Sequence, residues 1–291
     1  RQDDVFRRAR AKVRAGRKPA GARADCGIGA CRIPAGLSRD PISRGDQRGR
    51  GKGPVLTISI RTVGQTGSTN DDMLAMGRDG APEGSWLRAE SQTVGKGRSG
   101  RQWISPPGNL YATTLVRLHP SDPPAPSLAL VAAVALHETA SAYAQGRALT
   151  IKWPNDLLHD GAKLAGILLE REGDNVAVGI GVNLAHHPNL QDRPTTSVAG
   201  ATDAAPDPAG FLTDLAQSFA RWVGIWRGAG LSTIRAEWLS RAHPIGTALS
   251  AALPREQFDG LFDGLDETGA LRLRLADGSV RVIQAGDVFL L

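Results

Sequence analysis

The sequence predicts an α+β protein, in which a mixed β-sheet packs against helices and a small β-barrel follows at the C-terminal end. Three observations carry this prediction. Short strand candidates recur along the middle of the chain, two of them joined by a hairpin signal at Asp160-Gly161. Apolar residues over 127–145 have the spacing of a buried helix. Beyond Ala242 the pattern changes to short strands separated by Asp and Gly turns.

The first 53 residues differ in composition from the rest of the chain. They hold 15 of the 35 Lys and Arg residues and 5 of the 29 acids, a net charge of +10, whereas residues 54–291 carry −4. They contain only seven Val, Ile, Leu and Phe residues. Too little can be buried to offset the entropy of ordering, so we predict a disordered basic leader over 1–53. A basic arm for nonspecific nucleic-acid binding is the alternative, and its role is left open.

The cysteine content and the hydropathy of the chain indicate the cellular compartment of the protein. Both cysteines, Cys26 and Cys31, lie in the leader without a second Cys or His pair that would complete a tetrahedral metal site, so we predict no metal site. A chain without other cysteines fits a reducing cytoplasm. No apolar run approaches the ~18 residues of a membrane helix, and the N-terminus lacks the apolar region of a secretory signal. We therefore expect a soluble, cytoplasmic protein without a membrane partner.

The predicted catalytic-type domain, residues 54–241, begins with four elements. A strand is expected over 55–60, and Ser68-Thr69-Asn70 before two aspartates is typical of a helix N-terminus. Strands are expected over 86–91 and 110–116. The Gly-, Arg- and Pro-rich segment between these strands is too long for a tight hairpin, and long loops of this kind often carry function.

The later elements follow from the same patterns. The helix predicted over 127–145 packs on the sheet, and successive hairpins argue against a purely parallel sheet. Short strands are expected at 150–153, 157–159, 163–170 and 176–184, and helices at Phe211–Trp226 and Ser232–Arg241. Residues 242–291 form the predicted barrel domain.

The loop SQTVGKGRSGRQW carries the first chemical signal. Its glycines alternate with fixed positive charges, at Gly95, Lys96, Gly97, Arg98, Gly100 and Arg101. Glycines let backbone N–H groups approach a phosphate closely, and Lys or Arg neutralise it. The loop matches GxGxxG, but no helix follows and GxxxxGK[ST] is absent, so neither a dinucleotide site nor a P-loop is predicted. On its own, the loop fits a solvated surface loop equally well.

A second cluster of polar residues lies in IKWPNDLL and KLAGILLE. Within twelve positions it holds Lys152, Trp153, Asn155, Asp156 and Lys163. Pro154 and the two polar residues after it are ordinary turn residues. Lys163 beside an apolar strand either extends to solvent or meets an anion in a site.

Five segments together resemble the consecutive signatures of biotin protein ligases, in the family's order: GSTNDD, AESQTVGKGRSGRQW, GNLYATTLV, IKWPNDLLHDGAKLAGILLE and GIGVNL. The resemblance covers roughly residues 63–291. It implies a biotin/lipoate ligase-like catalytic domain and an SH3-like C-terminal barrel. It also implies an enzyme that uses ATP, with Mg²⁺, to form biotinyl-5'-AMP from biotin. The biotin would then pass to one lysine of a biotin carboxyl carrier domain, as in acetyl-CoA carboxylase.

The resemblance implies a role for individual residues. Four would hydrogen-bond biotin: Ser68, Thr69, Asn70 and Gln92. The loop that closes over the adenylate would contribute Gly95, Lys96, Gly97 and Arg98. Lys163 would approach the biotin carboxylate and the α-phosphate, and Gly166 would also belong to the binding site. Trp103 and Asn155 would lie on the nucleotide side. We expect Lys163 and Arg98 to be catalytic and regard Asp156 as a candidate general base.

Some of these residues could instead have a purely structural role. Ser68 and Thr69 could only cap a helix, and Trp103 could be a core aromatic residue. The family's loop usually has Arg at the position of Lys96. Lysine keeps the charge but loses the two-pronged hydrogen bonding of a guanidinium.

Other functions stay open as alternatives. A lipoate ligase of the same fold would differ in substrate, and a noncatalytic binding module would bind its ligand without releasing pyrophosphate. Some family members also repress transcription through an N-terminal helix-turn-helix, and no such pattern precedes Val55. We therefore expect a short form without specific DNA binding. A homodimer is left open.

Overall fold

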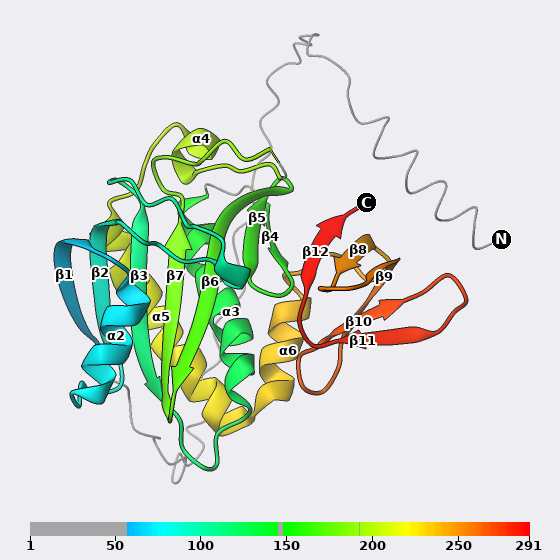
Figure 1. Cartoon of the computed structure of the whole chain (residues 1–291), viewed down its shortest axis with the longest axis horizontal. Helices are drawn as coiled ribbons and strands as arrows, with labels where there is room; N and C mark the ends of the chain where they lie inside the picture. The colour runs from blue at the N-terminus through cyan, green and yellow to red at the C-terminus, as the bar shows by residue number, and fades with distance from the viewer. Residues whose placement is uncertain (1–56, 145–147, 192) are drawn as a thin grey trace, which may run out of the picture. The chain divides into compact units, whose positions relative to one another are not determined.

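The computed structural model describes residues 57–144, 148–191 and 193–291 (Figure 1). The predictions made for the leader, residues 1–53, concern a part of the chain outside these ranges. The described residues form a large sheet with helices on both faces and a smaller C-terminal sheet.

A mixed sheet organises the larger part, as predicted, and it has seven strands. Its strand order is β1-β2-β3-β7-β6-β5-β4; β1 runs parallel to β2, and every other neighbouring pair is antiparallel. The strands are β1 (Ser59–Thr66), β2 (Ser85–Gln92), β3 (Leu110–Arg117), β4 (Leu149–Lys152), β5 (Asp156–His159), β6 (Ala162–Glu172) and β7 (Asn175–Val182).

Helices cover the two faces of this sheet unequally. The helices are α2 (Thr69–Arg78), α3 (Leu128–Tyr143), α4 (Val198–Thr202), α5 (Pro208–Ala229) and α6 (Leu231–Leu239), with 3-10 turns η1 (Arg98–Gly100) and η2 (Ala125–Ser127). Figure 1 shows α2 on one face and α3, α5 and α6 on the other. Strand β3 serves both faces: Ala112 and Val116 face the main core, and Leu115 packs with Met73 of α2. This alternation follows from the two-residue period of a strand.

Helix α3 is the most apolar element. By length and composition alone, residues 125–143 would suffice to cross a membrane, although no uninterrupted apolar run of that length was found in the sequence. In the structure 61% of that window is buried inside the protein, and α3 packs against α5, α6 and the sheet. The core therefore accounts for its composition.

Two local predictions had different outcomes. Asp160 and Gly161 form the predicted two-residue hairpin between β5 and β6, both with positive φ (48° and 77°), as a type I′ turn requires. The strand predicted over 55–60 was wrong in its bounds, because β1 covers Ser59–Thr66. As an edge strand that pairs only with β2, β1 exposes most of its side chains and lacks the apolar pattern on which the prediction relied.

The predicted C-terminal β domain is a five-stranded antiparallel sheet. Its order is β11-β10-β9-β8-β12, from β8 (Ala248–Ala252), β9 (Gln257–Leu265), β10 (Leu271–Arg274), β11 (Val280–Ile283) and β12 (Asp287–Leu290). Phe262 packs edge-on against Trp238 of α6 with ring centroids 6.4 Å apart. The indole N–H of Trp153 donates to the Gly269 carbonyl oxygen at 3.2 Å. The apolar core is thus continuous between the two sheets.

Candidate active site

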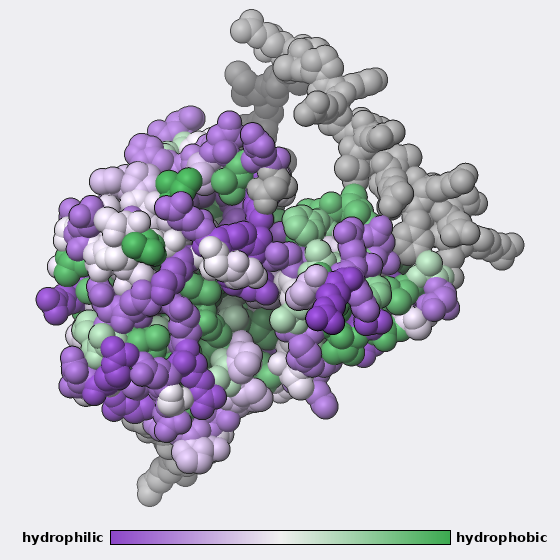
Figure 2. Space-filling view, in the orientation of Figure 1, coloured by the Kyte–Doolittle hydropathy of each residue, from purple (hydrophilic) through white to green (hydrophobic). Residues whose placement is uncertain are grey.

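A cavity of about 300 Å³ brings together segments that are far apart in the sequence. Its walls come from the start of α2, the loop between β2 and β3, the turn between β4 and β5, strands β6 and β7, and β12 of the C-terminal sheet. Figure 2 shows hydrophobic side chains in the hollow between the two sheets and hydrophilic ones over most of the surrounding face. Every site residue expected from the sequence lines this cavity except Gly95.

The start of α2 presents a hydroxyl that the helix does not use. Ser68 is the N-cap residue and is 4% exposed, yet within the described residues its side chain makes no capping hydrogen bond. The amide Oε1 of Gln92 takes that place, because it accepts from the Thr69 backbone N–H at 2.9 Å and from the Thr69 hydroxyl at 3.1 Å. A capping role therefore does not explain Ser68, whose hydroxyl lies at the cavity wall.

Asn70 is held by protein groups on all sides. Its amide nitrogen donates to Glu170 Oε2 at 2.8 Å and to the Leu168 carbonyl oxygen at 3.3 Å, and its oxygen accepts from the Thr113 hydroxyl at 2.7 Å. A Cβ on Gly179 would lie 2.2 Å from that oxygen. Asn70 thus ties α2 to the sheet and shapes the wall.

The glycine-rich loop folds back on itself. The Gly97 N–H donates to the Arg101 carbonyl oxygen at 2.7 Å, and the Trp103 N–H donates to the Gly95 carbonyl oxygen at 2.9 Å. A Cβ on Gly95 would lie 2.4 Å from the Trp103 carbonyl oxygen, so this position requires glycine. Gly95 therefore shapes the loop from outside the cavity wall.

Trp103 forms part of the wall and does not belong to the buried core. Its half-buried indole lies against strands β6 and β7, where a Cβ on Gly166 or Gly181 would come within 3.1 or 2.6 Å of the ring. The ring centroid is 5.4 Å from Lys163 Nζ. The indole N–H is buried and, among the described residues, has no hydrogen-bond partner. A donor without a partner at a cavity wall is suited to a polar ligand.

Two lysines share one buried carboxylate. Asp156 is 5% exposed; its Oδ1 lies 2.6 Å from Lys163 Nζ and its Oδ2 lies 3.6 Å from Lys152 Nζ. Burial lowers the pKa of Lys152 below its ordinary value, against the opposing effect of Asp156. The two lysines and Asp156 therefore carry a net positive charge, because one carboxylate neutralises only one of the two cations.

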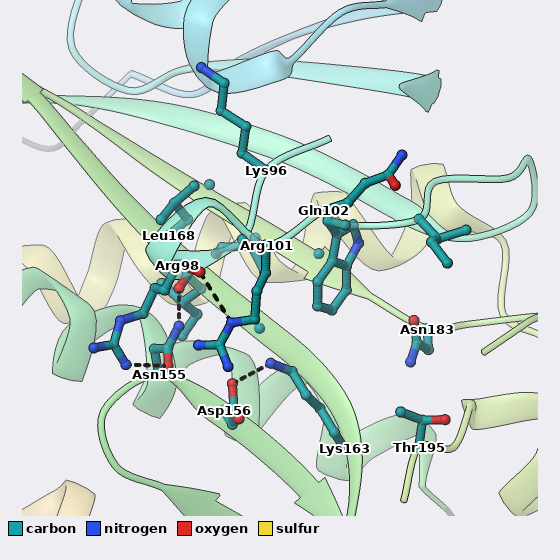
Figure 3. A pocket seen from close by; sticks show the side chains of 18 of the residues that line it. Lys96, Arg98, Arg101, Gln102, Asn155, Asp156, Lys163, Leu168, Asn183 and Thr195 are labelled. Atoms are coloured by element: carbon teal, nitrogen blue, oxygen red, sulfur yellow. Dashed lines mark hydrogen bonds and ion pairs between the residues drawn. The ribbon is translucent and has the colours of Figure 1, made fainter. Parts of the chain in front are cut away.

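Two arginines add to this charge (Figure 3). Arg98 donates to Asn155 Oδ1 at 3.3 Å, and Arg101 donates to the Arg98 carbonyl oxygen at 3.2 Å. Burial lowers the pKa of Arg98, but a guanidinium still remains charged at neutral pH. In Figure 3 Lys96 points away from these groups; its Nζ pairs with Asp71 Oδ1 at 2.6 Å. The charge of Lys96 is thus directed toward α2.

Several residues that line or support the cavity did not stand out in the sequence. Thr113 and Glu170 act behind the wall, and Asn183, whose amide donates to the Thr196 carbonyl oxygen at 3.0 Å, lies on it. The available signals were a hydroxyl within the apolar strand LYATTLV and an amide side chain near the end of GIGVNL. Asp287 had none, because its partners lie in another part of the chain.

Two family models match the chain. The Biotin/lipoate A/B protein ligase family matches residues 65–185, which supply most of the cavity, and the Biotin protein ligase C terminal domain matches residues 250–291. Fold and cavity together therefore define the class of biotin and lipoate ligases.

Similar proteins narrow this class. The chain is 40% identical to a biotin--[acetyl-CoA-carboxylase] ligase of Paracoccus denitrificans, over 78% of this chain and 98% of that protein. It is 36% identical to the enzyme of the same name from Mycobacterium tuberculosis, over 79% and 88% of the two chains. The fold matches a biotin protein ligase from Aquifex aeolicus with a TM-score of 0.72 and 22% identity, over 80% of this chain and 99% of that one.

The chain belongs to the biotin protein ligases. The resemblance stated from the sequence motifs is thereby confirmed, as is the prediction that the protein is an enzyme of the ligase class.

Proposed function

We propose that this ligase joins biotin to ATP as biotinyl-5'-AMP and then transfers the biotinyl group to one lysine of a biotin carboxyl carrier domain. The observation that carries the proposal is the presence of two kinds of side chain in one cavity. Ser68, Thr69 and Gln92, the last two hydrogen-bonded to each other, form an uncharged polar group, whereas Lys152 and Lys163, which share Asp156, form a cationic group with Arg98. A neutral, polar head group fits the first group and an anionic tail with phosphates fits the second.

The first half-reaction has an electrostatic obstacle. A biotin carboxylate oxygen attacks the α-phosphorus of ATP, and pyrophosphate leaves with the electron pair of the broken P–O bond. Two unit charges 4 Å apart repel by about 4 kcal/mol at an effective dielectric constant of 20. Lys163 and Arg98 offset this repulsion and stabilise the charge that develops on the phosphate oxygens.

Mg²⁺ fits this site as a companion of ATP. Among the described residues no group of three or more His, Cys, Asp or Glu side chains gathers in one place. The carboxylates on the cavity wall, Asp156 and Asp287, are each paired with a cation. The ion would therefore be held mainly by the phosphates, whose charge it would neutralise.

The second half-reaction consumes the mixed anhydride. A neutral lysine amine of the carrier attacks the biotinyl carbonyl carbon, an amide bond forms, and AMP leaves. We infer that Asp156 orients Lys163 at the reacting carboxyl group, since the two lie 2.6 Å apart. It is also the nearest candidate to receive the proton of the attacking amine.

Loop closure protects the intermediate in this proposal. A mixed anhydride hydrolyses if water reaches it, and a glycine-jointed loop that covers the adenylate excludes water. Trp103 and Asn155 would contact the nucleotide, with the unpartnered indole N–H as a donor. We place the reaction in the cytoplasm, where ATP and carboxylase carrier domains are found.

The test is incorporation of biotin into a purified biotin carboxyl carrier domain, with ATP and Mg²⁺, followed by mass spectrometry. We expect a mass increase of one biotinyl group on one lysine, and no labelling when lipoate replaces biotin. Labelling with lipoate alone would support the lipoate ligase instead. Binding of biotin without labelling of any carrier would support a noncatalytic binding module.

A further inference from the structure

Three cations of the active-site cavity bind three consecutive residues at the start of β12. Arg98 donates to the Gly286 carbonyl oxygen at 3.2 Å, and Arg101 donates to Asp287 Oδ1 at 2.7 Å. Lys152 donates to the Val288 carbonyl oxygen at 2.8 Å. Figure 1 shows β12 beside β4, which carries Lys152. The C-terminal sheet therefore contacts the charged wall of the cavity at one short segment.

Asp287 is the one ionised partner that this segment offers. The hydrogen bond and charge of Arg101 keep its pKa below the ordinary value, although partial burial acts in the opposite direction. Its side chain is 33% exposed and that of Arg101 37%, so the pair lies at the cavity rim and not in the core. An ion pair at this depth contributes little to global stability.

The pair has a local consequence for the loop. Arg98 and Arg101 are three residues apart, and the charge of Arg101 disfavours the charged form of Arg98. The carboxylate of Asp287, on the C-terminal sheet, offsets that repulsion. Asp287 also anchors the loop, because it binds the guanidinium of Arg101. The same guanidinium donates to the carbonyl oxygen of Arg98. The guanidinium of Arg98 is thereby kept beside Asn155.

We propose that Asp287 is a positioning residue, which holds the loop of residues 95–103 on the C-terminal sheet so that Arg98 faces the cavity before ATP binds. The inference rests on the proposed function for its effect on ATP. The anchoring of the loop does not depend on it. Preorganised charges act without reorganisation at the moment of reaction, which is the advantage of such an anchor.

The first test measures the loop in the ligand-free full chain by hydrogen–deuterium exchange. In Asp287→Asn we expect peptides covering residues 95–103 to exchange about two- to fivefold faster, the range set by a partly exposed ion pair. The matched control is Asp263→Asn, which removes a carboxylate paired with Arg272 at 2.8 Å on the same sheet. That variant should leave loop exchange unchanged. Equal exchange in wild type and Asp287→Asn would overturn the proposal.

The second test separates positioning from a structural role. With biotin-dependent ATP–pyrophosphate exchange as the assay, Asp287→Asn should raise KM for ATP by about two- to fivefold with a smaller change in kcat. Arg101→Gln should reproduce this effect, and the double variant should be no worse than either single one. Asp287→Glu should recover most of the loss. A lower KM for ATP in Asp287→Asn would show that the carboxylate competes with the phosphates, contrary to the proposal.

The two tests fail independently. Absence of pyrophosphate exchange in the wild-type protein would contradict the proposed function, whereas the loop measurement uses neither biotin nor ATP. Faster loop exchange in Asp287→Asn would then still establish the anchor, and unchanged exchange would remove it even in an active ligase.

Discussion

Three glycines of β6 and β7 determine how closely side chains approach the sheet at the active site. Gly179 leaves room for the amide of Asn70, and Gly166 and Gly181 leave room for the indole of Trp103. None of these glycines has a positive φ, so the close contact, and not the backbone conformation, requires them. These three glycines therefore contribute to the site by leaving space for the side chains of Asn70 and Trp103.

Gly181→Ala should displace Trp103. The new Cβ would lie 2.6 Å from the ring, so the indole must move, and the cavity wall changes with it. We expect a rise of about tenfold or more in KM for ATP or biotin, equivalent to about 1.4 kcal/mol. Gly224→Ala in α5 is the control, because nothing lies within 4 Å of its Cβ position. It should leave KM unchanged, and equal kinetics in the two variants would contradict the assignment.

Two half-buried histidines predict a loss of stability in acid. Burial lowers the pKa of His137 and of His243. The unfolded chain binds protons near the ordinary pKa of 6.5, whereas the folded chain resists protonation, so stability is present above pH 6.5 and declines as the pH falls through the folded values. Urea denaturation between pH 7.5 and 5 should show this decline, reduced in His243→Gln. An identical pH dependence in wild type and variant would rule out His243 as a source.

The residue scale also shows what the sequence could reveal. Ser68, Gln92, Arg98 and Lys163 lie in recognisable segments, and all line the cavity. Two long-range partners of other lining residues were not predictable, because Glu170 is 100 positions from Asn70 and Asp287 is 186 positions from Arg101. Sequence spacing carries no signal for contacts of that range.

At the scale of elements, the apolar pattern predicted the buried helix and strands but gave wrong bounds for the edge strand β1. Helix α3 and the hairpin between β5 and β6 follow from apolar spacing and turn chemistry. Strand β1 did not, because most of its side chains face solvent and its conformation depends on pairing with β2. The glycine-rich loop was predicted as a loop, but its return over Trp103 depends on tertiary contacts.

An ion cluster joins helix α5 to two loops, one before β2 and one after β3. Arg227 of α5 lies 2.8 Å from Glu83 and 3.1 Å from Asp122, and the three side chains are only 18%, 16% and 3% exposed. Arg227→Met should destabilise the protein by about 3 kcal/mol or more, because it leaves two carboxylates without their cation. Denaturant titration measures this loss.

The matched control for that cluster is an exposed ion pair. Arg78 and Glu172 lie 2.6 Å apart with side chains 54% and 49% exposed, so Arg78→Met should cost less than about 1 kcal/mol. Equal losses in the two variants would contradict the role given to burial at Arg227.

At the scale of the whole molecule, one cavity draws on both sheets. The large sheet, its loops and the start of α2 supply the polar groups and the cations, and β12 of the C-terminal sheet supplies Asp287, Val288 and Phe289. The sequence predicted two folded parts from a change in pattern near Ala242. It gave no sign that the second part completes the site of the first, since that depends on how the sheets pack.

The most direct test of the account is biotin-dependent exchange of labelled pyrophosphate into ATP without any carrier. We predict exchange in the wild-type protein and a loss of about a hundredfold or more in Lys163→Gln and Arg98→Gln, the size found when a group that stabilises developing charge is removed. Arg78→Met, whose ion pair is exposed and does not line the cavity, should retain full exchange. Wild-type protein that binds biotin without exchanging pyrophosphate, or exchange that survives both substitutions, would contradict the account.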